Sequence, residues 1–180
     1  NAYSTSLERA GTLKGLLDQL SWTTSSDFSE QIQFAISLLA LNVSRVVTLQ
    51  NYTGWDSHTN NDTTQSASFE TLFSGLNYLM DLLNSTPGTA GGATLADETV
   101  IVALSEMGRT PRLNGGQGKD HWPYTCAMVS GPGVNGGRVY GGYDLYYYGR
   151  RIDAASGEMD DDNGIILSSD VFGATLLTLA

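Results

Sequence analysis

Apolar residues recur at helical spacing in three stretches of the chain. The first stretch follows Ser26 and Asp27, whose side chains can cap a helix, and contains Phe28, Ile32, Ala35, Ile36, Leu39 and Ala40. The second contains Phe69, Leu72, Phe73, Leu76, Leu79, Met80 and Leu83. A third pattern starts at Asp170 and continues towards the end of the chain. Each stretch predicts an amphipathic helix.

Short apolar, β-branched runs alternate with these helical patterns. They cover Val43–Leu49, Thr99–Leu104 and Tyr124–Val129, and a polar or glycine-containing segment follows each of them. Continuous apolar strands that alternate with helices are typical of a parallel sheet covered on both faces. The pattern therefore predicts an α/β fold with a mainly parallel sheet sandwiched by helices.

The length of 180 residues is sufficient for one domain with its own core. Asn1 is not an initiator residue, and the last helical pattern stops without a cap, so we expect an incomplete part of a longer polypeptide. Residues 143–164 are expected to form a surface excursion. Within it, Asp160–Asp162 fits either a solvated turn or a calcium loop, and the spacing does not match an EF-hand.

Charge and composition limit the partners. The formal net charge is −10 with only nine Lys and Arg, which disfavours binding to nucleic acid or to an anionic membrane. No apolar run is long enough to span a bilayer. The acidic, lysine-poor composition favours an exported bacterial protein in the periplasm or outside the cell. The single cysteine, Cys126, is expected to be a small buried residue.

The two histidines each lie beside an aspartate in a glycine-flanked loop. These are the segments Asp56-Ser57-His58 and Asp120-His121. Residues two apart in an extended segment point to the same side, so Asp56 and His58 can converge on one ion, with His121 as a third ligand. Imidazole nitrogens mixed with carboxylate oxygen favour zinc, with calcium and manganese as alternatives. The competing interpretation is an ordinary hydrogen bond within each loop.

Acidic and basic residues follow the predicted strand Thr99–Leu104. Glu106 lies at the strand end where open parallel sheets place their ligands, and it could either bind a second ion or orient a ligand of the first. Arg109, Arg112 and Lys119 form a basic cluster in an otherwise acidic chain and are the candidate substrate-binding residues. Arg109 is also the candidate catalytic residue, because its planar guanidinium fits a phosphate or sulfate. The alternative is a salt bridge from Arg109 to Glu106 or Asp120.

Two further features lie near these residues. The glycine-rich segment Asn114–Gly118 lacks the pattern of a nucleotide loop and is expected to let the backbone pass close to the site. Trp55 and Trp122 either line a pocket or pack under the loops, and packing is the favoured interpretation.

Taken together, three ordered motifs carry a resemblance. They are Gly54-Trp55-Asp56-Ser57-His58, Glu106-Met107-Gly108-Arg109-Thr110-Pro111 and Asp120-His121-Trp122-Pro123. The chain resembles an exported bacterial family, domain of unknown function 1501, within the alkaline phosphatase and sulfatase superfamily. The resemblance implies an α/β/α sandwich with a metal site at the carboxyl ends of the strands.

The resemblance also implies roles for individual residues. The first metal site of the superfamily would fall on Asp56, His58 and His121, with Glu106 as an acidic ligand of the second site. Met107 stands where the superfamily commonly has a histidine, which argues against a fully occupied second site. The nucleophilic Ser or Thr of the superfamily would lie upstream of this chain.

The leading hypothesis is a metal-dependent hydrolase-like domain that acts on an anionic phosphate or sulfate ester. It would be completed by a missing N-terminal half, either from the same polypeptide or from a second chain. The alternative is a catalytically silent exported surface or assembly protein that keeps the fold. A carbohydrate-binding module that uses aromatic stacking is a third hypothesis.

Overall fold

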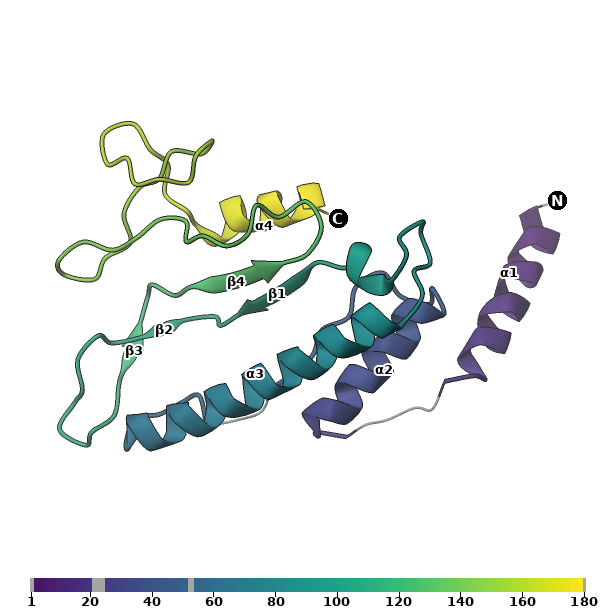
Figure 1. Cartoon of the computed structure of the whole chain (residues 1–180), viewed down its shortest axis with the longest axis horizontal. Helices are drawn as coiled ribbons and strands as arrows, with labels where there is room; N and C mark the ends of the chain where they lie inside the picture. The colour runs from purple at the N-terminus through teal and green to yellow at the C-terminus, as the bar shows by residue number, and fades with distance from the viewer. Residues whose placement is uncertain (1, 21–24, 52–53, 180) are drawn as a thin grey trace. The chain divides into compact units, whose positions relative to one another are not determined.

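The computed structural model describes residues 2–20, 25–51 and 54–179 (Figure 1). The chain divides into two compact units. The first unit comprises Asn1–Asp56 and Asp62–Thr99, and the second comprises Ser57–Asn61 and Val100–Ala180. The sequence pattern predicts one domain and gives no sign of this division. The short segment Ser57–Asn61, which carries His58, therefore belongs with the C-terminal unit.

The first unit is helical. Its elements are α1 (Ala2–Leu17), α2 (Phe28–Ala40), α3 (Asn61–Ser85) and the 3-10 turn η1 (Leu95–Asp97). Helix α2 begins where the sequence predicts, because the Asp27 side chain accepts a hydrogen bond from the backbone nitrogen of Glu30 at 3.0 Å. The predicted helices at Phe28–Ala40 and around Phe69–Leu83 are both confirmed.

The apolar stripes of α2 and α3 form the core of this unit. Ile32 is fully buried, and Leu83 is 1% exposed. Gly75 of α3 lies so close to Phe28 that a Cβ at this position would be 2.2 Å from the phenyl ring. Gln33 of α2 also donates a hydrogen bond to the Tyr78 hydroxyl of α3 at 2.7 Å. The two helices are therefore in direct contact through both apolar and polar side chains.

Glu98 fixes the loop between α3 and η1. Its carboxylate accepts hydrogen bonds from the backbone nitrogens of Thr89 at 2.8 Å, Ala90 at 2.7 Å and Gly92 at 2.6 Å. These bonds, with that from the Thr89 backbone the largest cause, lower the pKa of Glu98. The charged form of Glu98 is therefore the one that the loop requires.

A pH-dependent stability follows from the lowered pKa of Glu98. Its contribution is fully present above the pKa of the unfolded state and is lost as the pH falls through the lower folded-state pKa. We expect Glu98→Gln to lower the urea midpoint at pH 7 but to differ little from wild type below the folded-state pKa. Urea titrations of both proteins across this range test the prediction, and equal midpoints at pH 7 would contradict it.

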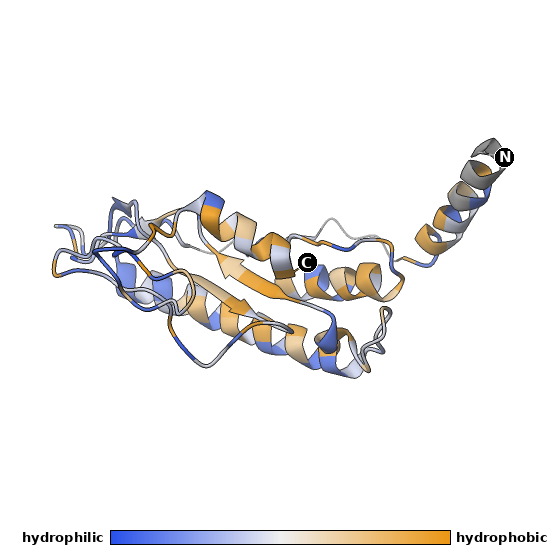
Figure 2. Cartoon of the chain, turned by 90° about the horizontal axis from the view of Figure 1, so that it is seen from above, coloured by the Kyte–Doolittle hydropathy of each residue, from blue (hydrophilic) through white to orange (hydrophobic). Residues whose placement is uncertain are grey.

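The second unit contains two short antiparallel ladders. Strand β1 (Ile101–Leu104) pairs with β4 (Ala127–Ser130), and β2 (Gly108–Arg109) pairs with β3 (His121–Trp122). Strand β1 is apolar throughout and is drawn in orange in Figure 2. Because β1 leads to β2 and β3 leads back to β4, residues 110–120 form the loop at the far end of a two-stranded arm.

The structure corrects one predicted strand. Val43–Leu49 is irregular, and Val46 is 78% exposed. Asn42 leaves α2 with a positive φ of 52°, and the Ser44 hydroxyl donates to the carbonyl of Val46 at 2.7 Å, which bends the segment. A β-branched run forms a strand only where a partner supplies a hydrogen-bonded ladder, and the structure pairs this segment with none of the strands that it describes.

The other expectations have mixed outcomes. The strand predicted at Thr99–Leu104 is confirmed as β1, and the helix predicted from Asp170 is confirmed as α4 (Ser169–Leu179). The strand predicted at Tyr124–Val129 begins later, at Ala127. Cys126 is exposed, so its predicted burial is wrong. It lies directly before β4, which begins at Ala127.

Both ladders among the described residues are antiparallel, and a parallel ladder is not found there. The expected α/β sandwich with a mainly parallel sheet stays a prediction. No helix within the described ranges is long and apolar enough to cross a membrane.

The excursion at residues 143–164 consists of turns tied together by isolated bridges. Ile152 bridges both Met159 and Ile165, and Arg150 forms an ion pair with Asp161. Asp161 and Asp162 are exposed, whereas Asp160 is half-buried. Asp160 accepts hydrogen bonds from the backbone nitrogens of residues 162 and 163, so the segment forms a turn.

Candidate metal centre

The segment that carries His58 is held against the loop 110–120 by backbone hydrogen bonds. The nitrogen of Lys119 donates to the carbonyl of Ser57 at 2.9 Å, and the nitrogen of Asn61 donates to the carbonyl of Gln117 at 2.8 Å. Thr59 and Gln117 also form an isolated antiparallel bridge. His58 therefore has a fixed backbone position beside this loop.

His121 reaches the same place from the ladder of β2 and β3. It lies opposite Arg109, and the ladder continues beyond β2 through a hydrogen bond from the nitrogen of Thr110 to the carbonyl of Asp120 at 2.9 Å. Directly opposite residues of an antiparallel pair project from the same face of the ladder. This register places the side chains of Arg109 and His121 on one face.

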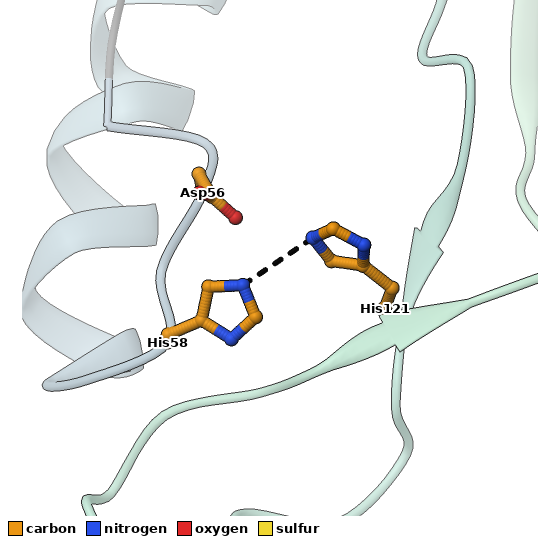
Figure 3. A group of neighbouring side chains, drawn as sticks. All are labelled: Asp56, His58 and His121. Atoms are coloured by element: carbon orange, nitrogen blue, oxygen red, sulfur yellow. Dashed lines mark hydrogen bonds between the residues drawn. The ribbon is translucent and has the colours of Figure 1, made fainter.

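The structure brings Asp56, His58 and His121 together. Each offers one ligand atom, and these atoms lie within 4.8 Å of one another. Asp56 directly precedes Ser57, so the local backbone sets its position relative to His58. Figure 3 shows the three side chains pointing towards a common space, with the Nε2 atoms of the two imidazoles 3.3 Å apart. All three residues are exposed.

The separation of the two imidazole nitrogens fits a tetrahedral ion. Zinc–nitrogen bonds of about 2.0–2.1 Å at a tetrahedral angle place two nitrogen ligands about 3.3–3.4 Å apart. The Nε2 atoms of His58 and His121 are 3.3 Å apart. The donor set of two imidazoles and one carboxylate also suits zinc. The residues present therefore fit a divalent ion of this kind.

Asp120 is a site residue that sequence reasoning did not assign. Its Oδ1 lies 3.0 Å from Nδ1 of His58 and accepts a hydrogen bond from Asn114 at 3.1 Å. The hydrogen bond to His58 is the largest cause that lowers the pKa of Asp120, and the bond from Asn114 is the second. The sequence signal for Asp120 is its position next to His121. The structure shows that its partner is His58, which sequence spacing could not indicate.

The glycine-rich segment Asn114–Gly118 has the expected role. A Cβ at Gly118 would lie 1.9 Å from the carbonyl carbon of His58, so only glycine permits this approach. Asn114, which the sequence analysis did not single out by itself, donates to the carbonyl of His58 at 3.1 Å. The loop therefore contacts the His58 carbonyl group through both Asn114 and Gly118.

The predicted basic residues have different positions. The guanidinium of Arg109 lies 3.5 Å from Nε2 of His58, and it donates to the carbonyl of Lys119 at 3.1 Å. Lys119 is half-buried and Arg112 is exposed. Among the predicted substrate-binding residues, Arg109 is the one that the structure brings to the imidazole of His58.

Glu106 is not brought into the ligand group that the described residues form. Its carboxylate is exposed and accepts a hydrogen bond from the Ser105 hydroxyl at 3.2 Å. The structure thus assembles the predicted first site from Asp56, His58 and His121. The assignment of Glu106 to a second ion stays a prediction.

Trp55 and Trp122 pack against other aromatic rings, which was the favoured interpretation. Trp55 contacts Phe69 edge to face at a centroid distance of 5.1 Å. Trp122 stacks on Tyr148 at 5.6 Å and donates a hydrogen bond to the carbonyl of Tyr147. Their rings therefore support the loops.

Comparison with known proteins gives one match. A family model described as "Protein of unknown function (DUF1501)" matches residues 11–156, which is most of the chain. Searches of curated proteins and of solved structures give no match. The matched range includes all three motifs that contain Asp56, Glu106 and His121. The chain therefore belongs to the DUF1501 family of proteins of unknown function.

Proposed function

We propose that the chain provides a divalent-metal centre, with zinc preferred, to a hydrolase that acts on phosphate or sulfate esters. The observation that carries this proposal is the 3.3 Å separation between the Nε2 atoms of His58 and His121, with the Asp56 carboxylate close by. Two facing nitrogens at this separation match the edge of a zinc coordination tetrahedron.

The number of ligands favours catalysis over a purely structural role. Structural zinc sites are closed by four protein ligands, whereas catalytic sites use three and keep one position open. The group formed by the described residues has three members, and all of them are exposed. An ion bound there would act as a Lewis acid that stabilises negative charge on an ester oxygen.

Arg109 supplies the positive charge that an anionic ester requires. Its guanidinium lies 3.5 Å from His58 Nε2, beside the proposed ion, and it is anchored by its hydrogen bond to the carbonyl of Lys119. A planar guanidinium can bind two oxygens of a phosphate or sulfate. Lys119 and Arg112 would add to the local positive charge without direct contact with the ion.

A phosphate-binding measurement tests the role of Arg109. We expect Arg109→Ala to weaken the binding of inorganic phosphate to the zinc-loaded protein by about tenfold to a hundredfold, because a charge-assisted hydrogen bond is lost. Isothermal titration measures this affinity. The control is Arg138→Ala, since the Arg138 guanidinium lies over the ring of Tyr140. Equal phosphate affinity in the Arg109 variant and in wild type would contradict the assignment.

We also propose that the protein belongs to the alkaline phosphatase and sulfatase superfamily and has its parallel α/β sandwich. Its nucleophile would lie upstream, and the protein would be exported to the periplasm or outside the cell. The three motifs and the acidic composition support these points. The decisive experiment measures hydrolysis of p-nitrophenyl phosphate and p-nitrophenyl sulfate by the full-length protein. We expect zinc-dependent turnover that Asp56→Ala abolishes.

A catalytically silent protein that keeps one ion is the second candidate. Two observations favour it: Met107 replaces a histidine common in the superfamily, and the described ligand group does not include Glu106. Zinc binding by the full-length protein with no hydrolysis of either ester would support this candidate and would overturn the proposed hydrolase.

A further inference from the structure

We propose that Asp120 is a positioning residue that orients His58 for metal binding, and that Asn114 holds Asp120 in place. The inference rests on the proposed metal centre and concerns how the protein prepares one of its ligands. It assigns functions to Asp120 and Asn114, neither of which is a member of the ligand group.

The contact between Asp120 and His58 selects the imidazole tautomer. Oδ1 of Asp120 lies 3.0 Å from Nδ1 of His58. An ionised carboxylate only accepts hydrogen bonds, so Nδ1 carries the hydrogen and Nε2 keeps a lone pair. Nε2 is the atom that faces Nε2 of His121. Asp120 thus directs a lone pair of His58 into the space where the ion would bind.

Asn114 in turn restricts the Asp120 carboxylate. Its Nδ2 donates to Oδ1 of Asp120 and to the carbonyl of His58, both at 3.1 Å. Its Oδ1 accepts from the backbone nitrogens of Gly116 at 2.9 Å and Gly118 at 3.0 Å. These four hydrogen bonds use both N–H groups and both lone pairs of the asparagine amide. The reversed amide would direct its NH2 group at two N–H donors, so only this orientation fits.

The backbone of Asp120 is also fixed. Its nitrogen donates to the hydroxyl of Thr110 at 3.0 Å, and its carbonyl accepts from the nitrogen of Thr110 at 2.9 Å. Burial does not immobilise the carboxylate, because the side chain is 57% exposed. Its orientation therefore depends on these hydrogen bonds. Such outer contacts typically change metal affinity by about tenfold to a hundredfold when they are removed.

The first test measures zinc affinity of the full chain by competition with a chromophoric chelator. We expect Asp120→Ala to bind zinc about tenfold to a hundredfold more weakly than wild type. Asp120→Asn should lose much less, because its amide oxygen can accept the same hydrogen bonds. Asp162→Ala, which removes an exposed carboxylate elsewhere in the same unit, should match wild type.

The second test needs no metal. Nitrogen-15 NMR of the imidazoles in the metal-free chain, at a pH where both are neutral, reports which nitrogen carries the hydrogen. We expect His58 in wild type and in Asp120→Asn to carry it on Nδ1. In Asp120→Ala we expect a shift towards the Nε2–H form that exposed histidines prefer.

The outcomes separate the inference from the proposed function. If wild type binds zinc and His121→Ala does not, but Asp120→Ala changes neither affinity nor tautomer, the positioning role is overturned and the metal centre stands. If Asp120→Asn loses as much affinity as Asp120→Ala, Asp120 acts as a ligand, and the inference is also overturned. If wild type binds no zinc, the proposed function fails, and the NMR result alone decides whether Asp120 orients His58.

Discussion

His121→Ala is expected to abolish zinc binding at the candidate centre. The substitution leaves two of the three ligands that the described residues bring together, and it removes one of the two nitrogens that face each other at 3.3 Å. The loss of a direct ligand should exceed the loss of an outer contact, so we expect zinc affinity to fall by more than about a hundredfold. Competition with a chromophoric chelator measures this change.

His58→Ala serves as the companion variant. Because both imidazoles bind the same ion, each single variant should lose a similar amount of affinity, and the double variant should lose little more. Circular dichroism should show that each variant keeps its helices, since His121 and His58 are exposed. If the losses of zinc-binding free energy in the two single variants added up fully in the double variant, the imidazoles would not bind a shared ion.

Gly118→Ala is expected to disrupt the centre without touching a ligand side chain. A Cβ at this position would lie 1.9 Å from both the carbonyl carbon and the carbonyl oxygen of His58. These are backbone atoms, so the loop and the His58 segment must separate to relieve the clash. We expect a loss of zinc affinity comparable to that of His121→Ala, together with a lower melting temperature.

Gly115→Ala is the matched control for this prediction. Gly115 lies in the same loop, and a Cβ there would meet nothing within 4 Å. This variant should bind zinc and unfold like wild type. If Gly118→Ala also matched wild type in both measurements, the close approach of the loop to His58 would not be needed for the site.

The parts of the fold that could be predicted are those set by local sequence. Helix α2 follows from an apolar stripe and the capping residue Asp27, and β1 follows from a continuous apolar run. Val43–Leu49 has equally strong β-branched character but does not form a strand, because strand formation depends on a distant partner. The pairing of β1 with β4 is likewise a tertiary contact, and its antiparallel direction was not anticipated.

The candidate site shows the same division. The ligands Asp56, His58 and His121 could be proposed from residue type, because each of the two histidines lies within two positions of an aspartate. Asp120 could not be assigned, because its partner His58 is 62 positions away in the sequence. Spacing alone could not separate Arg109, which lies beside His58, from Arg112, which is exposed.

The role of Asn114 was missed for a related reason. An asparagine beside several glycines is typical of a turn, and its sequence neighbours give no sign that its amide joins two distant segments. Its hydrogen bonds to His58 and Asp120 become visible only when the loop lies against the His58 segment. Residues of this kind, which hold ligands without binding the ion, are defined by the fold.

X-ray absorption at the zinc edge of the loaded protein identifies the atoms that bind the ion. We expect one zinc per chain with nitrogen and oxygen neighbours at about 2.0–2.1 Å and the outer-shell scattering of two imidazoles, one of which disappears in His121→Ala. Zinc bound through a sulfur neighbour at about 2.3 Å, as Cys126 would supply, or an imidazole signal unchanged in His121→Ala, would contradict this expectation.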